Sequence, residues 1–257
     1  MTNLIIGHRG FVGSNLSRLF TDAAGVGRQQ IKALAGCSFG DIYCAAPQAQ
    51  KWWANQNPEQ DRLEVDILIN DCKRLACTGY FILFSTVDVY DPPVAVDELC
   101  KPSEMSHPYG RHRFMLEQAV LDFFGSNARV IRLPALVGHG LKKNIIYDLL
   151  NNNNVEQINP NSAFQWFNLE QLPSMIDLAK SLGDGEILNV VSEPVATASI
   201  LNTWFAVLNE RLNWQSPPIG YDVRTVHGSE GSPYLYSAVD SLQLHLKPFV
   251  EAKKSLP

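Results

Sequence analysis

The sequence predicts an α/β fold in which helices cover both faces of a doubly wound parallel sheet. Short apolar runs alternate with longer segments whose apolar residues recur at helical spacing, most clearly in the first half of the chain. Strands that alternate with long helices are joined by crossovers, which make the sheet parallel and bury both of its faces. The expected strands are 3–7, 42–46, 80–85, 129–133 and 187–191, and the expected helices are 11–20, 57–77, 107–124 and 169–182.

The composition indicates a globular protein with a sizeable core. The chain has 257 residues, of which 46% are hydrophobic and 18% charged, and its formal net charge is -5. This length suits one large domain or two modest ones. The scattered Lys and Arg residues disfavour nucleic acid as a partner, and the apolar runs are too short to span a bilayer.

The cysteines and the first residues favour a cytoplasmic location. Five cysteines occur, an odd number without CxxC spacing, which argues against a disulfide framework and against a zinc site. Residues 1–7 carry no basic region of the kind that opens a signal peptide. We therefore expect a reducing compartment, no membrane contact and no bound metal.

The first strand ends in a glycine-rich turn suited to a pyrophosphate. Gly7, Gly10 and Gly13 form G-x-x-G-x-x-G, in which the glycines permit the turn, the approach of phosphate and close helix packing. Phe11 and Val12 open the following helix, whose N–H groups and dipole attract phosphate. The pattern predicts a Rossmann-like dinucleotide site, although spaced glycines also occur in ordinary turns.

The adenosine end of that site favours NADP(H) over NAD(H). NAD enzymes usually place an acidic residue after the second strand, where it binds the ribose 2′-hydroxyl. No Asp or Glu occurs between Asp22 and Asp41, whereas Arg9 and Arg28 are available for a 2′-phosphate. The alternative is NAD(H), with Arg28 as a solvated loop charge. The short distance in sequence from Gly13 to Asp41 also predicts a trimmed adenosine pocket.

The helix at 57–77 has a recognisable start. Asn57 as N-cap, Pro58 at the first helical position and Gln60 three residues after Asn57 predict a capping box.

The domain organisation follows from where the alternating pattern weakens. After Pro134 the elements become short, and Gly, Pro and Asn punctuate them. We expect a dinucleotide-binding core at 1–136, completed by about 167–192. A small C-terminal substrate-binding region, not an independent domain, is expected at 137–166 and 193–257. The expected loops are 151–154, 216–218 and 228–233.

A hydroxyl, a tyrosine and a cation are expected at one edge of the sheet. Thr86 follows strand 80–85, at the carboxyl edge where open α/β sheets bind ligands. Tyr109 lies in the first turn of helix 107–124, and Arg113 lies four positions on, so both side chains share one face. A tyrosine with a pKa near 10 needs a nearby cation to act as a base at neutral pH, and Arg113 can supply that charge.

These motifs resemble the extended short-chain dehydrogenase/reductases, the family of nucleotide-sugar epimerases, dehydratases and reductases. The glycine turn, the S-T-x-x-V-Y stretch at 85–90 and the Y-x-x-x-basic helix occur in the family's order. The resemblance covers most of the chain and continues through 132–140 and 189–194. The turn itself, GHRGFVGSNL, is similar to that of the NADPH-using GDP-fucose synthases.

The resemblance implies roles for single residues. Tyr109 would be the general acid/base, Thr86 would bond the same substrate oxygen, and hydride would pass at nicotinamide C4. Ala45, Ala46 and Pro134 would line the cofactor, and Tyr109 and Arg113 would also contact it. Arg113 stands where the family usually has lysine, and a guanidinium that stays protonated is a poor proton relay.

A second departure from the family narrows the reaction. Val87 and Asp88 stand where dehydratases carry an Asp-Glu pair, so dehydration is disfavoured. The resemblance places Lys142 and Asn144 near a substrate diphosphate, with a solvated loop as the equal alternative. The segment 164–168 suits a core strand somewhat better than a platform for a base. The expected substrate-binding residues are Ser85, Asp88, Lys142, Asn144, Gln165 and Asn168.

The function favoured by the sequence is an NADP(H)-dependent oxidoreductase or epimerase that acts on a nucleotide-activated sugar, with reduction ahead of epimerisation. The competing hypothesis is a catalytically impaired dinucleotide-binding sensor or scaffold of the same fold. The resemblance further implies a homodimer that pairs through the helices at 57–77 and 107–124.

Overall fold

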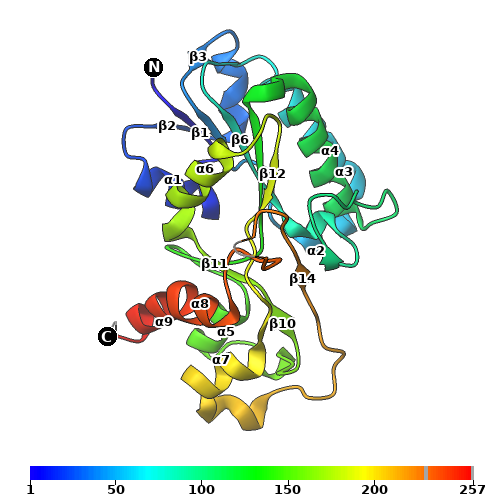
Figure 1. The fold of residues 1–257 in the computed structure, drawn as a ribbon, viewed down its shortest axis with the longest axis vertical. Coiled ribbons are helices and arrows are strands. Elements are labelled where there is room, and N and C mark those ends of the chain that lie inside the picture. The colour runs from blue at the N-terminus through cyan, green and yellow to red at the C-terminus, as the bar shows by residue number, and fades with distance from the viewer. Residues whose placement is uncertain (229–230, 256–257) are drawn as a thin grey trace. The chain divides into compact units, whose positions relative to one another are not determined.

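The computed structural model describes residues 1–228 and 231–255, and the chain divides into two compact units (Figure 1). Unit 1 comprises Met1–Pro92, Cys100–Leu133 and Glu170–Asn189, and unit 2 comprises Pro93–Leu99, Pro134–Leu169 and Val190–Pro257. The loop expected at 228–233 lies partly outside the described residues. No described helix is long and apolar enough to cross a bilayer.

Unit 1 is built on a six-stranded, wholly parallel sheet, which confirms the predicted fold class (Figure 1). The strand order is β12-β8-β6-β4-β1-β2. Because β2 and β4 lie on opposite sides of β1, the chain reverses its direction of travel across the sheet at β1. The strands are β1 (Leu4–Ile6), β2 (Ala24–Val26), β4 (Ile42–Cys44), β6 (Phe81–Thr86), β8 (Ala128–Leu133) and β12 (Ile187–Asn189).

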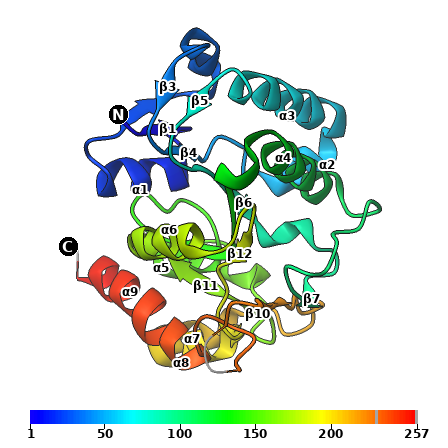
Figure 2. The same ribbon diagram turned by 45° about the horizontal axis from the view of Figure 1, so that its top comes forward.

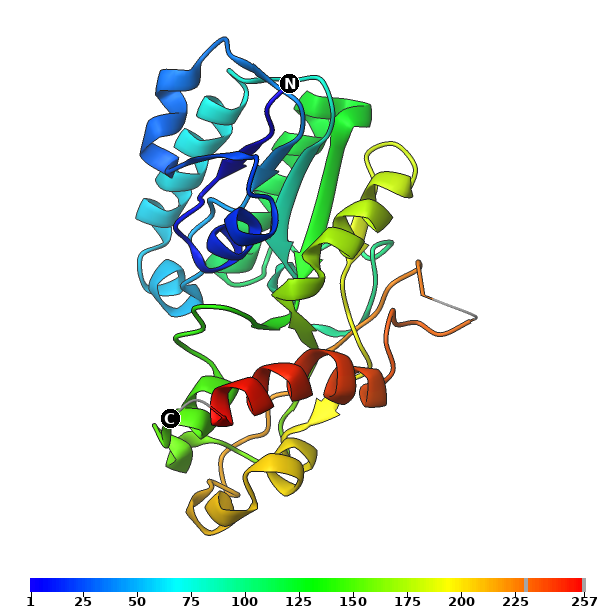
Figure 3. The same ribbon diagram turned by 90° about the vertical axis from the view of Figure 1, so that its left-hand side faces the viewer.

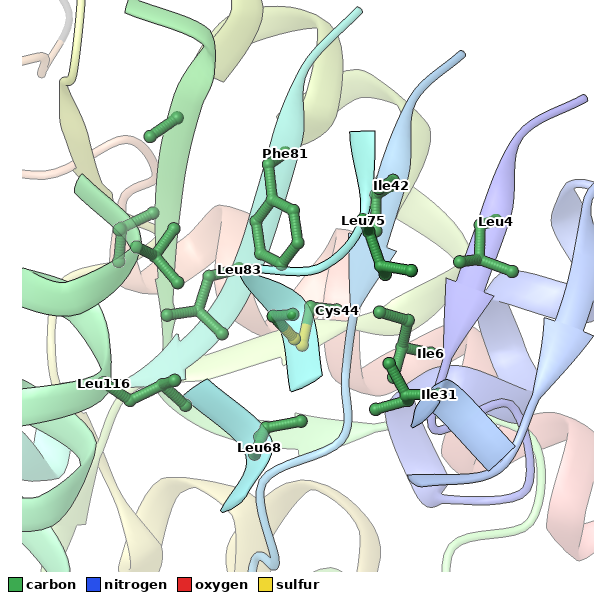
Figure 4. Packing of buried hydrophobic residues seen from close by; sticks show 14 of the residues in the cluster. Leu4, Ile6, Ile31, Ile42, Cys44, Leu68, Leu75, Phe81, Leu83 and Leu116 are labelled. Carbon is green, nitrogen blue, oxygen red and sulfur yellow. The ribbon is translucent and has the colours of Figure 1, made fainter. Parts of the chain in front are cut away.

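Helices pack on both faces of this sheet (Figure 2). Alternate strand residues, among them Leu4, Ile42 and Phe81, form a buried cluster with apolar residues of the helices α3 and α4 (Figure 4). Residues between them, such as Tyr43 and Arg129, face α1 and α6, as shown by the stacking of Tyr43 on Phe20 and the bond from Arg129 to Ala179. The helices are α1 (Phe11–Leu19), α2 (Lys51–Gln56), α3 (Pro58–Cys72), α4 (Pro108–Phe124) and α6 (Leu172–Ser181).

The expected helix at 57–77 begins as predicted, with Asn57 as N-cap and Pro58 in its first turn, but it is shorter than expected. It ends at Cys72, because Ala76–Cys77 forms strand β5, which pairs with β3 (Ser38–Phe39) in a separate two-stranded ribbon. The predicted capping box is wrong. The Asn57 amide donates instead to the Trp53 carbonyl oxygen, 3.0 Å away, because helix α2 ends directly before Asn57.

The described residues of unit 2 form short strand pairs and several helices. The C-terminal helices are drawn in red in Figure 3. The apolar core of unit 2 joins residues of α5, β11, α7 and the C-terminal helices. The pairs are β9 (Ala135–Val137) with β11 (Trp166–Asn168), β10 (Ala163–Phe164) with β13 (Val195–Ala196), and β7 (Val94–Val96) with β14 (Asp222–Val223). The helices are α5 (Ile145–Asn151), α7 (Thr197–Trp204), α8 (Ala238–Asp240), the π-helix η7 (Ser241–Leu246) and α9 (Lys247–Lys254).

Short 3-10 helices complete both units. In unit 1 they are η1 (Arg28–Leu34), η2 (Val87–Val89), η3 (Gly125–Asn127) and most of η5 (Leu169–Gln171), and in unit 2 they are η4 (Val155–Gln157) and η6 (Ala206–Arg211).

Candidate active site

The glycine turn lies at the point where the strand order of unit 1 reverses. Ligands of open α/β sheets bind at the carboxyl ends of the strands at such a point. Gly7 follows β1 with φ +83°, and a Cβ on it would lie 2.6 Å from the Ala45 carbonyl oxygen at the end of β4. A Cβ on Gly13 would collide with the Gly7 carbonyl group. Glycine is therefore required at both positions, and the turn is held close to β4.

The start of helix α1 is suited to an anion. Gly10 is its N-cap without a side-chain cap, and its first turn carries no acidic residue. The first N–H groups of a helix, here those of Phe11 and Val12 onward, have no partner within the helix. A Cβ on Gly10 would meet only the Gly7 and Ala45 carbonyl oxygens, at 3.3 and 3.9 Å. The fit to a pyrophosphate rests on this open glycine at a free helix N-terminus.

The two arginines expected at a 2′-phosphate differ in their surroundings. Arg9 is exposed in the glycine turn. Arg28 begins η1, which is separated from β2 by Gly27 alone, and its guanidinium lies 2.8 Å from the Glu64 carboxylate of α3. No acidic residue lies between Asp22 and Asp41, so the sequence near Arg28 gave no sign of a carboxylate partner. Glu64 contacts Arg28 from another helix, α3.

Thr86 and Tyr109 come together at the carboxyl end of β6. The Asp88 N–H donates to the Thr86 hydroxyl at 3.1 Å and fixes the turn that follows the strand. The start of α4 packs directly on this turn, because a Cβ on Gly110 would collide with the Asp88 carbonyl oxygen. The Asn55 side chain of α2 accepts from the Tyr109 N–H at 3.0 Å.

The Tyr109 phenol stays protonated at neutral pH. Burial, the largest cause, raises the pKa of Tyr109 to about 12, and the negative charges of Asp88 and Asp61 add to the increase. The positive charge of Arg113 and the Thr86 hydroxyl act in the opposite direction. Tyr109 is thus present as a proton donor at neutral pH. The Arg113 guanidinium carbon lies 4.5 Å from the centre of the Tyr109 ring.

Arg113 is held by a carboxylate that the sequence did not reveal. Its two terminal nitrogens donate to the two oxygens of Asp61, at 3.0 and 2.8 Å, and one also donates to the Gln48 carbonyl oxygen at 2.6 Å. Asp61 additionally bonds His112 at 2.7 Å. A signal was present, because Asp61 lies on the same helical stripe as the buried Val65 and Leu68.

Asp88 also has a cationic partner. The Lys51 ammonium of α2 lies 2.8 Å from the Asp88 carboxylate, and both side chains are partly exposed. Helix α2 is therefore attached to Asp88 through Lys51 and to the start of α4 through Asn55.

Ser85, expected at the substrate, is partly buried and bonds a buried ion pair. Its hydroxyl donates to Glu117 of α4, which forms a bidentate ion pair with Arg132 of β8. Arg132 also donates to the Tyr90 hydroxyl. Successive side chains of a strand point to opposite faces, so Ser85 and Thr86 of β6 point in different directions. The Ser85 side chain points toward α4.

Two of the expected substrate contacts of unit 2 require correction. Gln165 is buried, and its amide bonds the main-chain groups of Ser192 and Val223. Asn168 is buried as well and donates to the His245 carbonyl oxygen. Both lie in the interior because 164–168 forms the short strands β10 and β11, the structural alternative for this segment.

The other expected contacts of unit 2 lie near the start of α5. Asn144 caps this helix by accepting from the Tyr147 N–H at 3.0 Å, and Lys142 is exposed in the preceding loop. Pro134 is the first residue of its segment of unit 2.

A cavity of about 360 Å³ opens in unit 2 next to α5. Its walls combine apolar side chains with amide and hydroxyl groups and one carboxylate, and contain no Lys or Arg. The walls are formed by Ile145, Asp148, Asn154, Gln157, Ile158, Asn159, Ser162, Phe164, Ser216, Pro217 and Ile219. In the described part of the chain, no group of three or more His, Cys, Asp or Glu side chains is placed to hold a metal ion.

Comparison with known proteins identifies the fold. No family model and no curated protein matches the sequence. Among solved structures, a dTDP-4-dehydrorhamnose reductase from Yersinia enterocolitica has a TM-score of 0.71 at 16% identity, covering 98% of this chain and 99% of its own. The fold is that of the extended short-chain dehydrogenase/reductases.

Two further structures with this fold differ in what they bind. RMD from Pseudomonas aeruginosa, complexed with NADPH, has a TM-score of 0.71 at 15% identity and covers 99% of this chain and 100% of its own. A UDP-glucose 4-epimerase from Thermotoga maritima with UDP-glucose has a TM-score of 0.67 at 16% identity and covers 100% of both chains.

Proposed function

We propose that the protein is an NADP(H)-dependent oxidoreductase that reduces a ketone of a nucleotide-activated sugar. The observation that carries the proposal is the pairing of Thr86 with a protonated Tyr109 at the carboxyl end of β6, in the same sheet edge as the glycine turn. Two structures of the same fold support the proposal: the dTDP-4-dehydrorhamnose reductase, and RMD complexed with NADPH.

The cofactor would be held by the glycine turn and the end of β4. Gly7 and Gly10–Gly13 would take the pyrophosphate at the start of α1, Ala45 and Ala46 would line the nicotinamide half, and Pro134 would complete that wall. When bound, the cofactor supplies a hydride. Arg9 and Arg28 would contact a 2′-phosphate, and Glu64 would orient Arg28 toward it.

The chemistry of the chain's own residues is proton donation. The Tyr109 hydroxyl and the Thr86 hydroxyl would both donate hydrogen bonds to the ketone oxygen. As hydride reaches the carbon, the Tyr109 O–H bond breaks and the product's O–H bond forms. Arg113, 4.5 Å from the Tyr109 ring centre, would stabilise the phenolate left behind.

The cavity of unit 2, taken by itself, would suit a nucleoside. Its amide and hydroxyl walls suit the edges of a base, and the absence of Lys and Arg among its lining residues disfavours a phosphate there. Within unit 2, the exposed Lys142 would contact a diphosphate, and within unit 1, Asp88 would contact a sugar.

The direct test follows NADPH oxidation with a panel of 4-keto nucleotide sugars. Turnover with one of them is expected, and Tyr109→Phe should lower kcat by about 10²- to 10⁴-fold with NADPH affinity unchanged. Tight NADPH binding without turnover by any panel member would contradict the reductase and favour a sensor or scaffold, for which the confinement of Arg113 by Asp61 is the supporting observation. Tightly held NAD in the purified protein would favour an epimerase.

The cofactor preference has a separate test. Arg28→Ala should lower the NADPH affinity while leaving the NADH affinity nearly unchanged, and Lys32→Ala is the matched control from the same 3-10 helix. An unchanged affinity ratio in Arg28→Ala would remove Arg28 from the 2′-phosphate.

A homodimer paired through α3 and α4 is also proposed, in the cytoplasm, where five free cysteines stay reduced. Leu63 and Ile67 of α3 are about half exposed, as is Phe123 of α4. Burying such side chains in a second copy would be favourable. Light scattering should give the mass of two chains, and Ile67→Asp should give the mass of one.

A further inference from the structure

Asp61 is a carboxylate placed where the helix pattern calls for an apolar side chain. It shares the buried stripe of α3 with Val65, Leu68 and Cys72, and only 1% of its surface is exposed. A buried carboxylate is costly unless it is paired and fully bonded. Asp61 meets that condition, since it accepts two hydrogen bonds from Arg113 and bonds His112.

The ion pair lies directly against Tyr109. Arg113 cannot turn away, because its terminal nitrogens are taken by Asp61 and the Gln48 carbonyl oxygen while its guanidinium covers the Tyr109 ring. An uncompensated guanidinium at this distance would strongly favour the phenolate. The carboxylate opposes that effect through the same contact.

We propose that Asp61 is a positioning residue of the Tyr109 site, which fixes Arg113 against the ring and offsets part of its charge, so that Tyr109 keeps its proton until donation. The residue acts through Arg113 and needs no contact with substrate. The inference rests on the proposed function only for its consequence, which is that the site is set for reduction of a ketone.

The remaining charged groups around Tyr109 support this balance. From the turn after β6, Asp88 faces Tyr109 and is paired with Lys51 of α2. From its own helix, Arg113 and the His107 ring, whose centroid lies 6.3 Å from that of Tyr109, are the titratable neighbours. Burial and the nearby Lys51 ammonium lower the pKa of His107, so it is neutral at pH 7. Each of these charges thus has a partner of opposite sign, Asp61 with Arg113 and Asp88 with Lys51.

The test is a charge cycle read from the ultraviolet absorbance of tyrosinate, which requires neither substrate nor cofactor. The chain has 8 tyrosines, so subtracting the titration of Tyr109→Phe isolates the Tyr109 step. In Asp61→Asn, the pKa of Tyr109 should fall by about one to three pH units, because Arg113 is then uncompensated. In Arg113→Gln the pKa of Tyr109 should rise, so that its titration step moves above the pH range that can be measured.

The double variant Asp61→Asn with Arg113→Gln should have a Tyr109 pKa between those of the two single variants, because it removes both charges. If Asp61 had a purely structural role, the two single variants would not shift the pKa of Tyr109 in opposite directions. Asp66→Asn, an exposed acid of the same helix paired with Arg62, is the control and should change nothing. Circular dichroism at each pH identifies the range in which each variant is folded.

Two outcomes would overturn the proposal. One is a Tyr109 step that does not move in folded Asp61→Asn, and the other is a shift of both single variants in the same direction. Should Asp61→Asn fail to fold, the double variant decides. A Tyr109 pKa as high in the double variant as in Arg113→Gln would show that the Asp61 charge does not act on Tyr109. Failure of the proposed function would appear separately: no 4-keto nucleotide sugar would be turned over, while the Tyr109 pKa would still shift in the variants as expected. Where turnover is found, kcat of Asp61→Asn should decline at a lower alkaline pH than that of the parent.

Discussion

The two units bury different kinds of polar side chain. In unit 1 the interior holds charged residues, among them Asp61 with Arg113 and Glu117 with Arg132, each in a bidentate pair. In the described part of unit 2, the buried polar side chains are neutral amides, hydroxyls and one histidine. In the first unit, charge pairs thus join helix α3 to α4 and α4 to the sheet, and in the second, hydrogen bonds join side chains to the main chain.

The difference follows from how each unit is built. Unit 1 has long helices packed on a continuous sheet, so a charge on one helix stripe meets a charge on the facing element. Unit 2 has strands of two or three residues, which leave main-chain groups without ladder partners. Gln165 supplies three of those missing bonds, one to Ser192 and two to Val223. Removing a charge should therefore cost unit 1 more than removing an amide costs unit 2.

The largest expected effect is in unit 1, from Glu117→Ala. Arg132 would keep its charge in a fully buried position with its carboxylate partner removed. The free energy of unfolding should fall by about 3–5 kcal/mol. Asp122→Ala, an exposed acid of the same helix, should change it by less than about 0.5 kcal/mol. Urea unfolding measures both, and a loss below 1 kcal/mol for Glu117→Ala would remove the contrast between the units.

The next effect is the acid sensitivity of unit 2. His245 lies fully buried in the π-helix η7, and burial lowers its pKa to about 4. Between pH 6.5 and 4 the unfolded chain binds this proton and the folded chain does not, so stability falls as the pH falls through that window. The contribution is at most about 3 kcal/mol. In His245→Phe this part of the pH dependence should disappear, and a parallel decline in both proteins would assign it to other groups.

A smaller loss is expected from Gln165→Leu in the interior of unit 2. The replacement fills the space but leaves the main-chain groups of Ser192 and Val223 without their partner. Such a loss costs about 1–3 kcal/mol. Gln157→Leu, at an exposed position of the cavity wall, is the matched control and should be nearly neutral in thermal unfolding.

The smallest effect is expected from the cap of α5. Asn144→Ala removes the bond to the Tyr147 N–H and places alanine at φ +136°, a conformation that favours glycine. We expect a loss of about 1–2 kcal/mol, and a smaller one for Asn144→Gly, which relieves the backbone. If Asn144→Gly lowered stability as much as Asn144→Ala, the lost side-chain hydrogen bonds alone would explain the loss, without a contribution from the backbone conformation.

Much of unit 1 could be predicted because its signals are local. A glycine turn between a strand and a helix, and apolar runs of strand length, depend on residues that are neighbours in sequence. The prediction was wrong at Cys72, where a helical pattern continued into residues that pair as β5. It was also wrong for Gln165 and Asn168, which are buried, because residue type alone does not show which way a side chain points.

The sequence by itself determined the α/β class, the glycine turn and the positions of Thr86, Tyr109 and Arg113, since each rests on spacing within one or two elements. Only the tertiary structure decided which groups surround them. Arg113 meets Asp61 across 52 residues, and Arg28 meets Glu64 across 36. Contacts of this range are set by the packing of α3 against α4 and η1, so they appear only when the helices are in place.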